Sequence, residues 1–354
     1  YLSKRATQLR REKIIMKCIP VQEAVGAILC HDITQILPGE FKGRRFKKGH
    51  IIQEEDIPVL LSLGKDNIYV WENLPGMVHE NDAATFLKDI TMGDGLTFGE
   101  IKEGKITFTA AHDGLLKVDA DRLFQLNMLG EISFASLHNN LPVKKGEAVA
   151  GTRVIPLVID QKKLDEAKNL LDGHKIIEVK PMKSFNIGIV TTGSEVYYHR
   201  IKDKFGPILR GKMEGYHCTV AGQTFVPDNK EMIEQAIKDW LDKGADMVFC
   251  TGGMSVDPDD LTPSAIRDTG CEIITYGTPV LPGAMFLLSY YTDGRPVLGL
   301  PGCVMHSKVT VFDLIFPRIL AGEKITMADI AAFGHGGLCS NCAECHYPNC
   351  HFGK

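Results

Sequence analysis

Residues 245–260, ADMVFCTGGMSVDPDD, join a short apolar run to a loop of glycines, hydroxyl side chains and aspartates. The run at 245–250 is apolar enough for a strand that is buried on both faces of a sheet. Gly252 and Gly253 let the backbone turn sharply and approach a ligand closely. We therefore expect a buried strand whose carboxyl end carries a binding loop.

Strand-like and helix-like segments alternate on both sides of this stretch. Further strand-like runs lie at 185–190, 218–226, 271–277 and 296–300, and amphipathic, helix-like segments at 232–244, 262–270 and 307–320. Strands that alternate with helices form a mostly parallel sheet with helices on both faces. The sequence therefore predicts an α/β domain of three layers over residues 184–322.

The first half of the chain has a mixed pattern of short strands and helices. Apolar positions recur at helical spacing at 54–64, 79–90, 120–130 and 161–173. We predict a small α+β unit at 16–75, an accessory α+β region at 76–183 and a cysteine-rich tail at 323–354. A chain of 354 residues is in any case too long for one ordinary domain.

The charge and hydropathy of the chain argue against some classes of partner. The net charge of −4 shows no basic excess, so we expect no nucleic acid and no anionic membrane as a partner. No run reaches the ~18 apolar residues of a membrane-spanning helix. The first residues have no apolar core typical of a signal peptide, and we interpret 1–15 as an extension upstream of Met16. These features favour a cytoplasmic protein.

The ten cysteines fall into two groups. Six are scattered, namely Cys18, Cys30, Cys218, Cys250, Cys271 and Cys303, and four are close together near the C-terminus. Because no signal peptide is evident, we expect the scattered cysteines to be reduced thiols.

Three loops with glycine or proline follow predicted strands, at 191–195, 251–260 and 301–307. Ligands of open α/β sheets bind at the carboxyl ends of the strands, so we expect these loops to converge. Their N–H groups can cradle phosphate oxygens, and Asp257, Asp259 and Asp260 suggest a divalent cation beside them, Mg²⁺. Ordinary turn and helix-capping chemistry is the alternative.

Neither glycine loop carries a familiar nucleotide fingerprint. The first loop has a single glycine, and Gly252-Gly253 is not followed by Gly-Lys-Ser or Gly-Lys-Thr. Ordinary NAD binding and P-loop ATPase activity are therefore disfavoured.

Four segments, taken in order, resemble the molybdopterin-binding domain. They are TTGSEV at 191–196, CTGGMSVDPDDLT at 250–262, VLPGAMF at 280–286 and LGLPGCVMHS at 298–307. This domain is shared by molybdopterin molybdotransferases, molybdopterin adenylyltransferases and gephyrin, and the resemblance covers roughly residues 184–322. The separate N-terminal region resembles the molybdotransferase arrangement. The resemblance implies an α/β fold that binds molybdopterin, free or adenylylated, in a cleft.

The resemblance also implies roles for individual residues. The cofactor-binding residues would be Thr192, Gly193, Ser194 and Glu195 in the first motif, Thr251, Gly252, Gly253 and Ser255 in the second, and Pro282, Gly283, Pro301, Gly302 and Cys303 in the third and fourth. Asp257 and Asp260 would be catalytic, and Asp260 would also bind the metal.

The third and fourth motifs depart from the molybdotransferase pattern. Two lysines that usually flank the Pro-Gly of the third motif are absent from residues 281–285, and Cys303-Val304 replace Asn-Pro in the fourth. The loss of two cations removes charge compensation for a phosphate. Lys212, Arg210 or Lys308 could replace it. Cys303 is either a soft donor to a dithiolene or metal or a small buried thiol.

The C-terminal residues 337–354, GLCSNCAECHYPNCHFGK, contain the motif C-x2-C-x2-C-x4-C. We predict that these four cysteines, Cys339, Cys342, Cys345 and Cys350, bind a metal that folds the tail. The spacing of the first three suits a [4Fe–4S] cluster, whereas four thiolates also suit Zn²⁺, with His335, His346 or His351 able to replace one cysteine. A disordered, reactive tail is the alternative.

These observations leave two main functions open. The first is molybdenum cofactor biosynthesis with molybdate insertion of the molybdotransferase type. The second is a non-catalytic carrier of molybdopterin, or a regulator that responds to redox state or metal. A nucleotide pyrophosphatase or a deamidase-associated protein is a third. The resemblance implies a homodimer, pterin and molybdate as ligands, and molybdoenzymes or other proteins of the cofactor pathway as partners.

Overall fold

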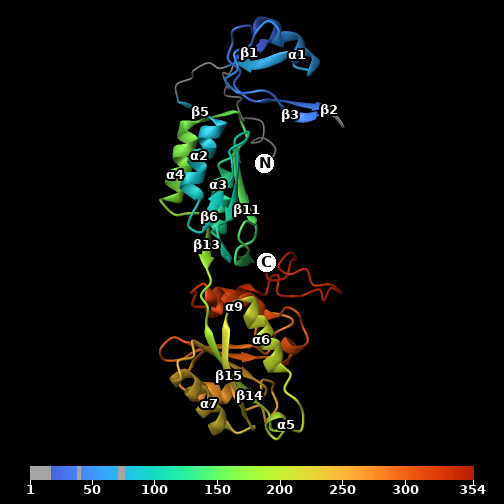
Figure 1. Cartoon of the computed structure of the whole chain (residues 1–354). Coiled ribbons are helices and arrows are strands. Elements are labelled where there is room, and N and C mark those ends of the chain that lie inside the picture. The colour runs from blue at the N-terminus through green and yellow to red at the C-terminus, as the bar shows by residue number, and fades with distance from the viewer. Residues whose placement is uncertain (1–16, 38–40, 71–75) are drawn as a thin grey trace, which may run out of the picture. The chain divides into compact units, whose positions relative to one another are not determined.

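The computed structural model describes residues 17–37, 41–70 and 76–354, which form two compact units (Figure 1). The first unit consists of the described part of residues 1–109 together with 119–136 and 148–177, and the second of residues 110–118, 137–147 and 178–354. The extension assigned to residues 1–15 lies outside the described residues. The domain boundaries expected from the sequence stay predictions.

The first unit contains four helices and several antiparallel strand pairs. The helices are α1 (Asp56–Ser62), α2 (Glu80–Thr91), α3 (Ala120–Met128) and α4 (Gln161–Leu171), and each falls on a segment with the predicted helical spacing. Asp119 and Asp160 cap α3 and α4, because their carboxylates accept the N–H groups of Arg122 and Lys162.

The strands of the first unit are short. β1 (Lys17–Pro20) pairs with β4 (Asn67–Val70), β2 (Ile33–Leu37) with β3 (Phe41–Phe46), and β5 (Met77–His79) with β12 (Val158–Asp160). β6 (Leu96–Phe98), β7 (Lys105–Ala110), β11 (Ala148–Val154) and β9 (Ile132–Ser136) form a four-stranded sheet in that order.

The second unit is built on a six-stranded sheet. Its order is β15 (Thr219–Val226), β14 (Asn186–Thr192), β16 (Met247–Thr251), β19 (Pro296–Leu300), β18 (Leu287–Tyr290) and β17 (Glu272–Tyr276). The first four strands are parallel, and β18 runs antiparallel to both of its neighbours. A smaller sheet has the order β10 (Leu141–Val143), β8 (Gly114–Val118) and β13 (Ile177–Pro181). The mostly parallel α/β sheet predicted from the sequence is confirmed. The antiparallel strand β18 is a further strand that the sequence did not predict.

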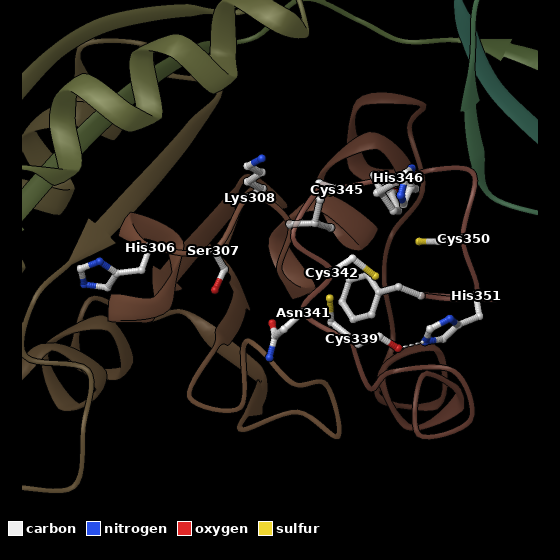
Figure 2. A pocket seen from close by; sticks show the side chains of 14 residues that line it. His306, Ser307, Lys308, Cys339, Asn341, Cys342, Cys345, His346, Cys350 and His351 are labelled. Carbon is white, nitrogen blue, oxygen red and sulfur yellow. Dashed lines mark hydrogen bonds between the residues drawn. The ribbon is translucent and has the colours of Figure 1, made fainter.

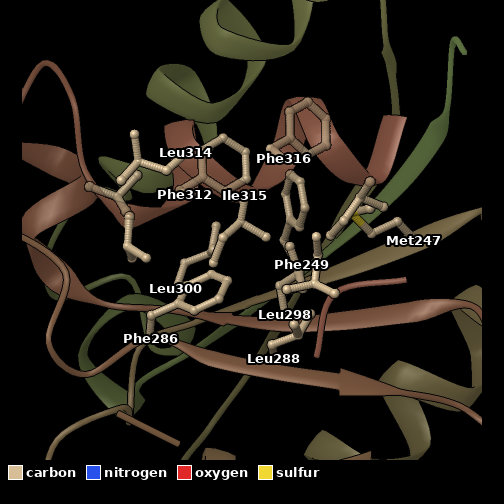
Figure 3. Close-up of a cluster of buried hydrophobic side chains, with 14 of the residues drawn as sticks. Met247, Phe249, Phe286, Leu288, Leu298, Leu300, Phe312, Leu314, Ile315 and Phe316 are labelled. Carbon is tan, nitrogen blue, oxygen red and sulfur yellow. The ribbon is translucent and has the colours of Figure 1, made fainter. Parts of the chain in front are cut away.

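Helices cover both faces of the six-stranded sheet. On one face, α6 (Phe205–Gly215) and α9 (Val311–Leu320) contribute to a buried apolar cluster that contains Phe249 of β16 (Figure 3). On the other face, α7 (Lys230–Asp242) and α8 (Thr262–Asp268) contribute to a second cluster around Val248 and Cys250. Successive residues of β16 therefore enter opposite cores, which confirms the three predicted layers.

The α9 helix is buried along its whole length, which explains its apolar sequence VFDLIFPRIL. The rings of Phe312 and Phe316 stack at a centroid distance of 4.8 Å, and the ring of Phe249 meets that of Phe312 at 5.5 Å. Thr310 and Asp313 form a capping box at the start of the helix. The helix is thus fixed directly after the fourth motif, which ends at Ser307.

Two short helices and a 3-10 turn complete the second unit. They are α5 (Ser194–Tyr197), α10 (Met327–Ala332) and the turn Gly302–Met305. Within the part of the chain that the structure describes, no helix has the length and apolar character needed to cross a membrane.

Candidate functional site

The three loops predicted to converge follow strands that lie side by side. β14, β16 and β19 are adjacent and parallel, so their carboxyl ends lie on one edge of the sheet. Hydroxyl groups join the strand ends: Thr251 Oγ1 donates to Thr191 Oγ1 at 3.0 Å, and Gln223 Nε2 donates to the same oxygen at 2.8 Å. Hydrogen bonds therefore hold together the strand ends from which the first two loops begin.

A hollow of about 530 Å³ lies at this edge, and we call it the strand-end cleft. Phe205 of α6 forms one part of its wall. The other lining residues belong to the second, third and fourth motifs: Gly252, Gly253, Met254, Ser255, Asp260, Leu281, Pro282, Gly283, Ala284, Met285, Leu300, Pro301, Gly302, Cys303 and Met305. A hollow of this size is within the range of about 300–1,000 Å³ that small-molecule sites have. Three of the four motifs thus share one cleft.

The first motif lies outside the lining of the cleft. Thr192 is buried, and its hydroxyl oxygen lies 3.1 Å from that of Thr262. The backbone N–H of Ser194 donates to the carboxylate of Asp228 at 2.9 Å, so a protein anion already occupies this donor. Gly193 and Glu195 are likewise absent from the lining, as is the buried Thr251 of the second motif.

The three aspartates of the second loop have different surroundings. Asp260 lines the cleft, whereas Asp257 and Asp259 are exposed and lie outside the lining. Asp260 accepts the N–H of Asp257 at 3.2 Å and donates its own N–H to the Asp257 carbonyl at 3.0 Å. Mg²⁺ in phosphate sites is commonly bound by one or two carboxylates together with the phosphates of the ligand, and Asp260 fits that role.

The charge of the cleft is unusual for a phosphate site. Among the described residues that line it, none is Lys, Arg or His, and Asp260 is the charged one. Lys212 cannot supply the missing charge, because its ammonium donates to Asp313 at 2.6 Å and to the Lys308 carbonyl at 3.1 Å. Lys308 and Arg210 also lie outside the lining. The candidate replacements named from the sequence are therefore not at the cleft in this structure.

Comparisons with known proteins find similar sequences over parts of the chain. A family model described as "probable molybdopterin binding domain" matches residues 188–321. The matched residues carry the four motifs and most of the six-stranded sheet. Residues 18–72 match a second family, which is described as a domain of unknown function.

Curated relatives cover parts of the chain at modest identity. A molybdopterin molybdenumtransferase of Haemophilus influenzae is 28% identical over 218 residues, which are 56% of this chain and 51% of that protein. One of Synechococcus elongatus is 24% identical over 144 residues, 38% of this chain and 36% of that protein. The chain thus spans about half of the length of the first relative and about a third of the second.

A solved structure gives the same kind of match. The molybdopterin biosynthesis enzyme MoaB of Thermus thermophilus is 20% identical, covers 39% of this chain and 98% of its own, and has a TM-score of 0.32.

Cys303 lies in the fourth motif of the molybdopterin-binding domain and lines the cleft. Burial raises the pKa of its thiol, and the nearby Asp313 carboxylate adds to this effect. The thiol is therefore protonated at neutral pH. Cys303 thus lies in the cleft wall as a half-buried thiol, and both roles named from the sequence, a soft donor and a small buried thiol, stay predictions.

The four C-terminal cysteines surround a different hollow, which we call the tail hollow (Figure 2). Within the described residues, no group of three or more His, Cys, Asp or Glu side chains is drawn together closely enough to hold a metal ion. All ten cysteines are free thiols, in line with the expectation for the scattered ones.

Two residues that the sequence reading overlooked shape the site. The hydroxyl of Tyr276 donates to the carbonyl oxygens of Met254 and Ser255, at 3.1 and 2.9 Å, and so fixes the second loop. Burial, together with the Asp260 charge, raises the pKa of Tyr276 and keeps this hydroxyl a donor. The other residue, Asp228, lies two residues after the strand at 218–226, and that position near a carboxyl strand end is the signal that could have revealed it.

Proposed function

We propose that the strand-end cleft binds molybdopterin, free or adenylylated, and that the chain acts in molybdenum cofactor biosynthesis. One observation carries this proposal: the second, third and fourth motifs of the molybdopterin-binding domain line a single cleft at the carboxyl ends of β16 and β19. Gly252, Gly253 and Gly302 line this cleft, and in this proposal their backbone N–H groups bind the phosphate oxygens of the ligand.

The charge of the cleft makes a divalent cation part of the proposal. A phosphate entering the cleft would meet the carboxylate of Asp260 with no lining Lys or Arg to offset its charge, among the residues described. Mg²⁺ bound between Asp260 and the ligand phosphates would neutralise both anions. The N–H of Asp257 holds the Asp260 carboxylate in place through its bond to Oδ2.

The activity proposed for the cleft is molybdate insertion with release of AMP from adenylylated molybdopterin. The support is that relatives named molybdopterin molybdenumtransferase match part of the chain, at 28% identity over 218 residues and 24% over 144. In this proposal Asp260, positioned by the Asp257 backbone, orients the metal at the phosphate. The lack of cations in the lining favours the second candidate, a carrier that binds the pterin without turnover.

AMP release separates these two functions. The purified chain is incubated with adenylylated molybdopterin, molybdate and Mg²⁺, and AMP is measured over time. We expect turnover that falls at least about 100-fold in Asp260→Asn, since the group that holds the cation loses its charge. Asp259→Asn is the matched control, because this aspartate belongs to the same loop but lies outside the cleft lining, and it should keep the wild-type rate. Tight binding of the pterin without AMP release would identify a carrier, and absence of binding would contradict the proposal.

Two further expectations stay predictions. They are the homodimer and the choice between zinc and an iron–sulfur cluster at the tail cysteines.

A further inference from the structure

The C-terminal tail, residues 337–354, is docked on the molybdopterin-binding domain at both ends. At its start, the N–H of Cys339 donates to the Leu281 carbonyl at 2.8 Å, and the N–H of Leu281 donates to the Gly337 carbonyl at 2.8 Å. Near its end, Phe352 is 2% exposed and belongs to the same apolar cluster as α9. The hydroxyl of Tyr347 donates to the Asp313 carbonyl at 3.2 Å. The tail is therefore part of the folded domain.

The docked tail brings its four cysteines around one hollow. Cys339 and Cys350 are half-buried against the apolar cluster, whereas Cys342 and Cys345 are exposed. In Figure 2 the sulfur atoms of Cys339, Cys342 and Cys350 point into the same space. His346 and His351 also line the hollow, while His306 lies at its far side (Figure 2).

Thiol chemistry limits what this hollow can bind. Four thiolates supply soft donors and a large negative charge, a combination that suits Zn²⁺ or an iron–sulfur cluster and not Mg²⁺ or Ca²⁺. The sulfur atoms face the hollow without converging on one point. Cys342 and Cys345 lie in an exposed stretch, 340–346, that forms neither helix nor strand, so they can close on a metal while Cys339 and Cys350 stay docked.

The tail hollow and the strand-end cleft share a wall. Within the fourth-motif loop, Gly302, Cys303 and Met305 line the cleft, and the next residues, 306–309, line the tail hollow. A second connection runs through Leu281, which lines the cleft and pairs with Leu338 of the tail as a β-bridge. Both connections are short and lie within one compact unit. A change in how firmly the tail is docked therefore affects the third and fourth motifs, which are two of the three motifs that form the cleft.

We propose that the four tail cysteines bind a thiolate-coordinated metal centre, and that this centre holds the third and fourth motifs in their ligand-binding arrangement. The second half of this inference rests on the proposed function of the cleft. The metal acts by fixing the tail against Leu281 and the 301–309 loop, and it takes no part in chemistry at the pterin. Loss of the metal loosens the shared wall and weakens binding of molybdopterin.

Metal content tests the first half without any pterin. The full chain is purified without oxygen, and zinc, iron and acid-labile sulfide are measured on one sample. We expect about one zinc per chain, or about four iron with equal sulfide. The double variant Cys342→Ser/Cys345→Ser removes two exposed thiols and should lose this metal. Cys18→Ser removes an exposed thiol of the other unit and should keep it. A wild-type chain without metal, or a double variant that retains it, would overturn the site.

Backbone hydrogen exchange and pterin binding test the second half. In the double variant we expect faster exchange in residues 301–309 and at Leu281, with unchanged exchange in β14 and β16. Molybdopterin should bind at least about tenfold more weakly to the double variant than to Cys18→Ser. Unchanged exchange at the shared wall would overturn the coupling even if the metal site is real. If the wild-type chain binds metal and protects the wall but does not bind molybdopterin, the proposed function fails and the metal site stands.

Discussion

The strand-end cleft and the tail hollow lie on two sides of one loop, yet they are built in different ways. The cleft is formed by the loops that follow β16, β17 and β19, and every residue of β16 and β19 is buried. The tail hollow is formed largely by a segment without helix or strand, which is anchored through Phe352 and Tyr347. The sheet therefore sets the geometry of the cleft in advance, whereas the geometry of the tail hollow depends on its anchors and on the ligand that it binds.

Loss of the Phe352 side chain, which anchors the tail, should open the tail hollow and leave the sheet intact. We expect Phe352→Ala to weaken the docking of the tail by about 3 kcal/mol, because removal of a buried phenyl ring leaves a cavity. The measurement is the rate at which Cys339 and Cys350 react with a thiol reagent, which should rise at least about tenfold. Phe124→Ala is the control, since Phe124 is 65% exposed. Unchanged reactivity of both cysteines would show that other contacts dock the tail.

A substitution in the cleft should instead affect the whole domain. Gly252 has a φ of +85°, and a Cβ atom there would lie 2.1 Å from the Thr192 carbonyl oxygen. Gly252→Ala should therefore cost roughly 3 kcal/mol in the free energy of unfolding, from left-handed strain plus overpacking. Gly244 has a φ of +84° with no atom within 4 Å of its Cβ position, so Gly244→Ala measures the strain alone, about 1 kcal/mol. Urea denaturation compares them, and equal costs would contradict the close approach of the two loops.

Acid should destabilise the segment that leads into the tail. Burial acts to raise the pKa of Asp329 in α10, but hydrogen bonds from Thr326 and Arg318 outweigh it and lower the pKa to about 2. A carboxylate with a depressed pKa stabilises the fold above the unfolded-state pKa, and this stabilisation is lost as the pH falls from about 4 to about 2. The loss should be about 1 kcal/mol, because solvent screens a carboxylate that is only partly buried. Asp329→Asn should remove this part of the pH dependence when unfolding is measured between pH 6 and pH 2, and an unchanged profile would contradict the assignment.

A smaller effect is expected for the hydroxyl that fixes the second loop. Tyr276→Phe removes the hydrogen bonds to the Met254 and Ser255 carbonyls and should cost about 1 kcal/mol or less, because Tyr276 is 39% exposed. The change should appear as faster hydrogen exchange in residues 254–260. Tyr198→Phe, at a tyrosine that is 59% exposed, controls for the loss of a hydroxyl. Equal exchange in both variants would show that the loop is fixed without Tyr276.

Much of the fold could be predicted from apolar runs. The runs at 185–190, 218–226, 245–250, 271–277 and 296–300 coincide with the observed strands. The mostly apolar runs at 185–190, 245–250 and 296–300 form the buried, parallel strands β14, β16 and β19, whereas β15 and β17 lie at the edges of the sheet and are partly exposed. The strand Leu287–Tyr290 was missed. It pairs with β19 as a hairpin, and the alternation of strands with helices gives no signal for a hairpin inside an α/β domain.

The sequence motifs predicted which loops form the candidate site, but they did not predict which charged side chains face it. Glycine and proline mark the second, third and fourth loops, and the structure gathers these loops at one cleft. The family resemblance singled out Asp260 as the metal ligand, but the residue pattern alone could not distinguish it from Asp257 and Asp259, because which side chain faces the cleft depends on the turn between them. It also could not show that Lys212 is engaged by Asp313, a partner 101 residues away in the sequence.

The dependence of molybdopterin binding on Mg²⁺ tests the central claim most directly. Equilibrium dialysis without oxygen measures binding to the full chain, with Mg²⁺ and with EDTA. Because Asp260 is the charged residue among the described residues that line the cleft, we predict binding at least about tenfold tighter with Mg²⁺. This difference should disappear in Asp260→Asn and persist in Asp259→Asn. No binding under either condition, or the same Mg²⁺ dependence in all three proteins, would contradict the account.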